Sequence, residues 1–259
     1  MAIGAHPDDI EFRMAGTLIL LGKLGWKLHY MNIADGCCGS VTMNAQETAR
    51  TRVQEAAESA ALIGAKFYPS ITPDIEVYHE RPIIQKVCAA IRQAAPTILL
   101  VPSPQDYMED HTNASRVAVT AAICRNIPNY VSDPPVKSID NEMCIYHAQP
   151  HEHIDQLRNF ITPDFVVNTT SAIGTVREML CCHRSQKEWL DATQGADNYI
   201  AWMENGERKM GELAASTGSA CEVEFGEGWR QHSWMAYGPQ DFDPLRVALR
   251  EYIINVGKN

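Results

Sequence analysis

The sequence predicts a single α/β domain in which helices flank a mostly parallel sheet. Over the first two thirds of the chain, short apolar segments alternate with longer segments whose apolar residues recur at helical spacing, and this alternation is typical of βαβ units. The regular alternation of strands and helices is interrupted near Asp133. Further strands and helices follow, so we expect the sheet to continue rather than a second domain to begin. A chain of 259 residues is long enough to bury a sizeable core.

The predicted elements begin at the amino terminus. Ala2–Ala5 is the first strand, and it leads into a helix over Ile10–Leu24 that Gly25 ends. The other strands are expected where short apolar runs stand between turn residues: Trp26–Ile33, Phe67–Tyr68, Thr97–Val101, Met143–His147 and Phe165–Asn168. The other helices are expected where helical spacing meets start or stop signals such as proline and glycine: Ala45–Ile63, Pro82–Ala95, Asn113–Cys124, Ala172–His183 and Leu245–Val256. Residues 186–215 are expected to be helical and residues 218–242 irregular, and the whole is expected to be Rossmann-like.

The charge balance and the lengths of the apolar runs exclude two classes of protein. The chain has 22 Lys and Arg against 32 Asp and Glu, a net charge of −10, and no basic cluster. Binding to a nucleic-acid backbone is therefore not its main activity. The longest apolar runs, such as Leu18–Leu21 and Thr97–Val101, are far shorter than the roughly 18 residues that suggest a membrane span. We expect neither a nucleic-acid nor a membrane partner.

The cysteines and the amino terminus indicate a compartment. Four of the eight cysteines form two adjacent pairs, Cys37-Cys38 and Cys181-Cys182, and no two cysteines have C-x-x-C spacing. This pattern fits neither a zinc ribbon nor a disulfide framework. The segment Met1–His6 has neither the charged region nor the long apolar region of a signal peptide, so we expect a reducing, cytoplasmic location, whether or not residues precede Met1.

A polar cluster follows the first predicted strand directly. His6, Asp8 and Asp9 stand between that strand and the next helix, so their side chains lie at the carboxyl end of a parallel strand, where open α/β sheets bind ligands. Two acidic groups beside an apolar strand are costly unless a positive charge neutralises them, and a metal ion is the simplest neutraliser. The alternative is that Asp8 or Asp9 only caps the following helix.

A second cluster favours the metal. The strand Thr97–Val101 leads into a loop that ends at Asp110-His111, so both clusters are expected to meet at one edge of the sheet. Two imidazoles and one carboxylate form a familiar catalytic zinc set, although the same set also suits ferrous iron. Of Asp8 and Asp9, one would be the ligand and the other the base that takes a proton from water.

These residues resemble the LmbE-like, or PIG-L-type, zinc-dependent N-deacetylases. Members of this family open with a strand that ends in A-H-P-D-D, which is present in full here as Ala5–Asp9. The other resembling segments occur in the family's order: Ala34-Asp35-Gly36, Arg52-x-x-Glu55 with Leu62-x-Gly64, His183-Arg184-Ser185-Gln186, and Gly226-Glu227-Gly228-Trp229-Arg230. The resemblance covers most of the chain and implies one such domain over residues 1–259.

The resemblance implies specific roles. It assigns the zinc ligands to His6, Asp9 and His111 and the general base to Asp8, and it predicts contacts with substrate for Arg52 and Asp35. It also implies one zinc ion per chain, a small sugar-like N-acetylated substrate such as an N-acetylglucosamine derivative, and a homo-oligomer.

The second motif departs from the family at one position. The family pattern is P-x-D-x-H-P-D-H, and here Met108 replaces its first histidine. That histidine is expected to stabilise the charged oxygen and to protonate the leaving amine, and methionine can do neither. We predict that His183 supplies the missing donor, with His147 and Tyr107 as alternatives. Hydrolysis of a different amide, or a metal-binding protein without activity, remains the competing interpretation.

Several other residues have plainer interpretations. His151 is expected to be a solvent or core histidine. Trp189 and Trp202 are expected to lie in the core or in a subunit contact. Asp106 is expected to shape its loop through local hydrogen bonds.

Overall fold

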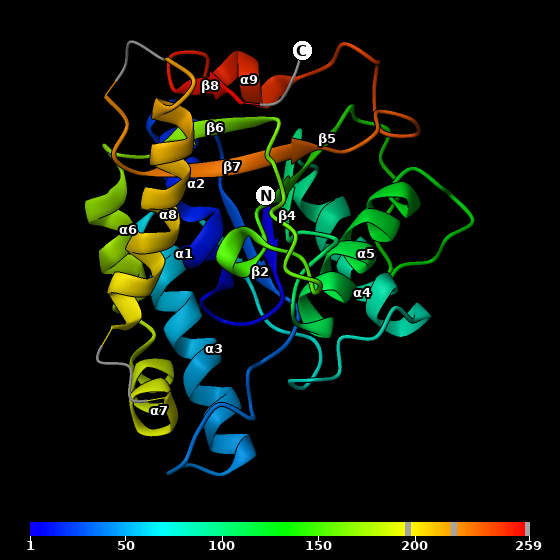
Figure 1. Cartoon of the computed structure of the whole chain (residues 1–259). Coiled ribbons are helices and arrows are strands. Elements are labelled where there is room, and N and C mark those ends of the chain that lie inside the picture. The colour runs from blue at the N-terminus through cyan, green and yellow to red at the C-terminus, as the bar shows by residue number, and fades with distance from the viewer. Residues whose placement is uncertain (195–197, 219–221, 257–259) are drawn as a thin grey trace.

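One eight-stranded sheet forms the centre of the computed structural model, which describes residues 1–194, 198–218 and 222–256 (Figure 1). Its strand order is β3-β2-β1-β4-β5-β7-β6-β8. The strands are β1 (Ala2–Gly4), β2 (His29–Asn32), β3 (Lys66–Tyr68), β4 (Ile98–Val101), β5 (Cys144–Ala148), β6 (Phe165–Asn168), β7 (Gly226–Gln231) and β8 (Ile253–Asn255). The strands from β3 to β5 are parallel, whereas β7 pairs antiparallel with β5 and β6, and β6 pairs antiparallel with β8. The predicted α/β fold is confirmed.

Helices cover both faces of the sheet. They are α1 (Asp9–Arg13), α2 (Ala15–Lys23), α3 (Ala45–Leu62), α4 (Arg81–Ala94), α5 (Glu109–Cys124), α6 (Ile173–Leu180), α7 (Arg184–Gln194), α8 (Tyr199–Ala215) and α9 (Pro244–Ala248), with a short 3-10 turn, η1, at His151–His153. Figure 1 shows α4 and α5 on one side of the parallel strands and α3, α6 and α8 on the other. Among the described helices, none combines the length and apolar character that crossing a membrane requires.

The strands divide their side chains between two apolar cores. Ile3, Met31 and Leu99 belong to the core beneath α4 and α5, whereas their strand neighbours Tyr30 and Leu100 belong to the core on the opposite face. This alternation follows from the two-residue period of a strand. It leaves the carboxyl ends of β1 and β4, which are neighbours, as a common edge for polar residues.

The helix predicted over residues 10–24 is two helices, because a distant carboxylate caps the second one. The break falls at Met14, and the backbone N–H groups of Gly16 and Thr17 donate to Glu227 at 2.7 and 2.8 Å. A carboxylate at a helix amino terminus satisfies free N–H groups and interacts favourably with the helix dipole. Glu227 comes from β7, so its role could not be inferred from the local sequence.

The predictions for the chain after residue 217 were wrong in two places. The segment 218–242, expected to be irregular, contains β7, and the helix expected over Leu245–Val256 is α9 followed by β8. Gly226 and Gly228 lie within β7, where neighbouring segments pack closely against the backbone. A Cβ on Gly226 would lie 2.5 Å from Cγ1 of Val166. Glycine in a strand often marks such a close approach.

We predict that Trp229→Ala greatly destabilises the protein. Trp229 of β7 is fully buried, and its indole N–H donates to Thr17 Oγ1 at 3.0 Å. Loss of a buried tryptophan costs about 3–5 kcal/mol, so the free energy of unfolding from urea titration should fall by that amount. Trp234, which is 42% exposed, offers the matched control. An equal loss in Trp234→Ala would show that the effect does not come from burial.

Candidate metal centre and active site

The two polar clusters meet at the edge of the sheet, as expected. His6 and Asp9 follow β1, and His111 lies in the first turn of α5, directly after the loop that follows β4. One ligand atom from each of these three residues lies within 4.8 Å of the other two. Asp9 is fixed by its neighbours, since its Oδ2 accepts from the backbone N–H groups of Ala5 and His6 at 2.9 and 2.8 Å.

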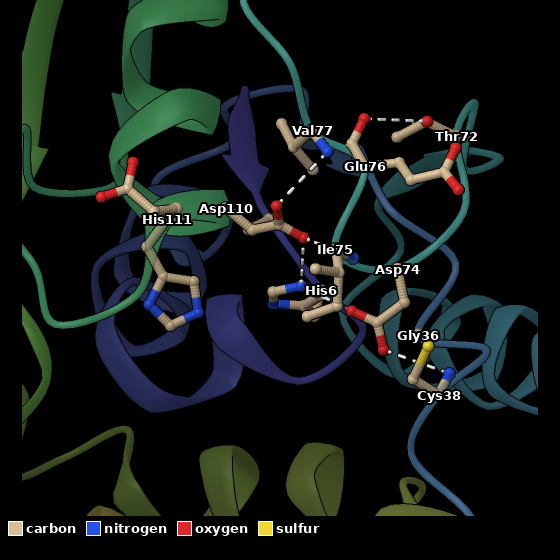
Figure 2. Close-up of polar contacts among 12 residues, drawn as sticks. His6, Gly36, Cys38, Thr72, Asp74, Ile75, Glu76, Val77, Asp110 and His111 are labelled. Atoms are coloured by element: carbon tan, nitrogen blue, oxygen red, sulfur yellow. Dashed lines mark hydrogen bonds and ion pairs between the residues drawn. The ribbon is translucent and has the colours of Figure 1, made fainter.

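The ring of His6 is held between carboxylates (Figure 2). Its Nε2 lies 3.0 Å from Oδ1 of Asp74 and 3.0 Å from Oδ2 of Asp110, and its Nδ1 lies 3.7 Å from Oδ2 of Asp9. The backbone N–H groups of Ile75 and Val77 donate to Asp110 at 2.8 and 3.3 Å. Burial alone would lower the pKa of His6, but hydrogen bonds to Asp110 and Asp74 raise it to about 9.

The ring of His111 is held in a similar way. Its Nδ1 lies 2.9 Å from Oδ1 of Asp106, and its Nε2 lies 3.4 Å from Oδ1 of Asp9. Asp106 also accepts from the backbone N–H of Met108 at 3.2 Å, which is the loop-shaping role expected of it. Its other oxygen accepts from the backbone N–H of His151 at 3.0 Å, so this one carboxylate positions two histidines.

This donor set fits a divalent metal ion. His6 Nδ1, His111 Nε2 and the Asp9 carboxylate face one another, while the opposite nitrogen of each ring is held by a carboxylate. Histidines that bind metals commonly have such a partner, which fixes the ring and its tautomer. A second acidic group, His6 with Asp74 and Asp110, lies within the same 4.8 Å limit. Its carboxylates already accept protein N–H groups, so we assign it to the layer that supports the ligands.

Asp8 stands beside this set in a strained conformation. Its φ of 107° lies in the left-handed region, which is unfavourable for any residue except glycine, and such strain concentrates at functional sites. The side chain makes no capping hydrogen bond to α1, so the capping interpretation fails. Oδ1 lies 3.6 Å from Nη2 of Arg52, and Oδ2 accepts from the hydroxyl of Tyr199. Burial raises the pKa of Asp8, and the charge of Arg52 partly offsets this rise.

Arg52 and Asp35, the two residues expected to contact substrate, lie differently relative to the cavity. Arg52 borders the cavity, and its guanidinium donates to the carbonyl oxygens of Pro7 at 2.7 Å and Gly36 at 3.2 Å. The contacts of Arg52 therefore hold the side chain of Asp8 and the loop at Gly36 in place. Asp35 is not among the described residues that line the cavity, and its Oδ1 accepts from the backbone N–H of Cys37 at 3.0 Å. This hydrogen bond stabilises a turn, and the contact of Asp35 with substrate stays a prediction.

The structure does not bring His183 to the cavity. Its side chain is fully buried, and its Nε2 lies 3.3 Å from Oε1 of Glu11, a carboxylate that also accepts from the hydroxyl of Tyr30. His183 therefore lies in the layer behind Asp8, without access to a substrate. Of the alternatives, His147 pairs with His232 at 2.9 Å outside the cavity wall, whereas Tyr107 lies on the wall and is 64% exposed.

The cavity has a charged floor and an aromatic wall. Its volume is about 250 Å³, and the wall residues with aromatic rings are Phe12, Tyr107, His151, Trp189, Tyr199 and Trp202. The two tryptophans expected in the core or in a subunit contact therefore border the site. Met108 also lies on the wall.

Sequence reasoning missed Asp74, His151 and Tyr199. A signal existed for His151, because it follows β5, the parallel neighbour of β4, at the same edge of the sheet. No local signal existed for Tyr199, which reaches Asp8 from 191 residues away.

The comparisons with known proteins agree with the resemblance. Residues 1–122 match the family model described as PIG-L, GlcNAc-PI de-N-acetylase. The similarity to this family therefore lies in the amino-terminal part of the chain. The diacetylchitobiose deacetylase of Thermococcus kodakarensis is 27% identical over 146 residues, which are 54% of this chain and 55% of that protein. The match thus spans about half the length of that relative.

Solved structures show the same fold over most of the chain. The N,N'-diacetylchitobiose deacetylase of Pyrococcus horikoshii is 23% identical with a TM-score of 0.73, and the match covers 94% of this chain and 87% of that one. GalB, the 4-carboxy-2-hydroxymuconate hydratase of Pseudomonas putida, is 20% identical with a TM-score of 0.74, covering 89% and 94%. The shared fold therefore extends beyond residue 122, and the names of these two proteins describe different activities.

We predict that His111→Ala weakens metal binding by about tenfold or more, because a three-ligand site has no ligand to spare. Metal content per chain, measured by elemental analysis after dialysis, should fall accordingly. His79→Ala is the control, since His79 is an exposed residue that contacts Thr120 on the helix surface. Full metal content in His111→Ala would refute the ligand assignment.

Proposed function

We propose that this protein is a metal-dependent N-deacetylase acting on a small, sugar-like N-acetylated molecule. The observation that carries the proposal is the position of Asp8: a strained, buried carboxylate at the cavity wall, next to a set of two histidines and one aspartate. The relatives with deacetylase names support the reaction class. We extend the family assignment to all 259 residues as one domain.

His6, Asp9 and His111 would hold the ion, which we propose to be one zinc per chain, with ferrous iron also compatible with these ligands. Such an ion supplies a Lewis acid that polarises a carbonyl group and makes water more acidic. Asp8 would accept the proton of the attacking water, and burial, which raises the pKa of its carboxyl group, makes the carboxylate a stronger base. Arg52 and Tyr199 hold the Asp8 carboxylate in place through its two oxygens.

The cavity supports a substrate with one ring. A volume of about 250 Å³ suits a single sugar better than an extended chain. Sugar rings and aliphatic faces pack well on tryptophan, and Trp189 and Trp202 offer such faces. A homo-oligomer in a cytoplasmic location remains part of the proposal and follows from the family resemblance and the cysteine pattern.

Hydration of a carbon–carbon double bond is the second candidate. Met108 favours it. A hydration releases no amine, so it needs no residue at position 108 that protonates a leaving amine. A hydratase is also among the structures of the same fold.

Acetate release decides between the candidates. Zinc-loaded protein is incubated with N-acetylglucosamine, N-acetylglucosamine glycosides and diacetylchitobiose, and free acetate is measured; a parallel incubation with 4-carboxy-2-hydroxymuconate follows the loss of the conjugated chromophore. Acetate release supports the deacetylase, and loss of the chromophore alone supports the hydratase. Zinc binding with neither reaction would support the inactive, metal-binding interpretation.

We predict that Asp8→Asn lowers kcat for acetate release by about 100- to 10,000-fold while the metal content stays constant, because an amide cannot accept the proton. Asp140→Asn makes the same chemical change at an exposed position and should leave the rate near that of the wild type. Normal turnover by Asp8→Asn would place the base elsewhere.

A further inference from the structure

The proposed reaction needs a hydrogen-bond donor that Met108 cannot supply. Attack of water on an amide carbonyl places negative charge on the carbonyl oxygen, and enzymes stabilise this oxygen with a donor that is already in position. A thioether has no hydrogen to donate. The donor must come from another residue on the cavity wall.

Three polar groups on that wall already donate to protein acceptors. The Arg52 guanidinium donates to the carbonyl oxygens of Pro7 and Gly36. The Tyr199 hydroxyl donates to Asp8, and the indole N–H of Trp202 donates to Glu152 at 2.6 Å. These groups are engaged in holding the site together.

His151 differs from these groups. Its ring stacks on His111, with centroids 5.0 Å apart and an interplanar angle of 26°, and its Nε2 lies 3.8 Å from Oδ1 of Asp9. It lines the cavity, but among the described residues it does not belong to the set whose ligand atoms lie within 4.8 Å of one another. The ring therefore lies next to the ligands without being one of them.

The turn that carries His151 has a strained backbone. Glu152 and His153 both have left-handed backbone conformations, with φ of 56° and 63°, and two consecutive residues of this kind are unfavourable without glycine. Three contacts to other elements hold the turn. The backbone N–H of His151 donates to Asp106 at 3.0 Å, Glu152 accepts from Trp202, and His153 Nε2 lies 2.9 Å from the carbonyl oxygen of Gly206 in α8.

We infer that His151 is a catalytic residue whose Nε2–H donates a hydrogen bond to the carbonyl oxygen of the substrate, in place of the family histidine lost at Met108. The strained turn is then the means by which the chain places this ring beside His111. A neutral imidazole is sufficient, since one of its two nitrogens always carries a hydrogen. The inference rests on the proposed function.

The test compares His151→Phe with His151→Gln. Phenylalanine keeps the ring on His111 but cannot donate, whereas the glutamine amide can place an N–H near the position of Nε2. We expect His151→Phe to lower kcat for acetate release by about 100-fold or more, with KM changed much less, because a lost oxyanion donor typically has an effect of that size. His151→Gln should recover at least about tenfold of the loss. His79→Phe is the matched control at an exposed position.

A second measurement does not depend on turnover. Acetate has carboxylate oxygens that can accept from Nε2, so its binding to the zinc-loaded protein, measured by calorimetry, should be weaker in His151→Phe than in the wild type or in His151→Gln. If the wild type releases no acetate from any substrate, the proposed function fails, and acetate binding still tests the donor. Reduced metal content in His151→Phe would overturn the inference by making His151 a ligand, and equal acetate binding in all variants would overturn it by removing the donor.

Discussion

The burial of negative charge at the carboxyl ends of β1 and β4 is the constraint on which the site depends. Five aspartates, Asp8, Asp9, Asp74, Asp106 and Asp110, lie close together, and four of them are almost fully buried. Burying an unpaired carboxylate costs several kcal/mol, so each one needs a compensating partner. The chain provides imidazole rings, one guanidinium and the backbone N–H groups of adjoining loops, and a bound divalent cation would complete the balance.

Compensation of this charge also explains how the site is kept rigid. Each aspartate satisfies more than one donor, as Asp106 does with His111, Met108 and His151. Loops that bear catalytic groups are usually mobile, but these loops are fixed to one another by their own charged groups. The backbone strain at Asp8 and in the turn at Glu152 and His153 is tolerated because hydrogen bonds to other elements determine the backbone conformation there.

The sequence was sufficient to predict the part of the site that is formed by residues directly after the strands. Two polar segments after two parallel strands sufficed to predict that His6, Asp9 and His111 converge, because strand neighbours share an edge. The residues that were missed or misplaced depend on contacts between distant segments. Tyr199 reaches Asp8 across the molecule, and no signal in its own neighbourhood marks it. Glu227 stands in a recognisable motif, but that motif does not show that its carboxylate caps α2. His183 resembled a donor by motif, whereas its burial against Glu11 follows from packing that no motif encodes.

Most of the aromatic wall comes from a later part of the chain than the proposed metal ligands. The proposed ligands, Asp8 and two wall residues, Phe12 and Tyr107, lie within the first 122 residues. The other wall residues with aromatic rings belong to the part that follows: His151, Trp189, Tyr199 and Trp202. The later part also supplies β5 and β7, so it cannot be removed without dismantling the sheet. The later part therefore contributes to both sides of the proposed chemistry: His151 and Tyr199 lie beside the proposed ligands and base, whereas Trp189 and Trp202 only border the cavity. Substitutions at these two tryptophans can change which molecule fits while His6, Asp8, Asp9 and His111 remain as they are.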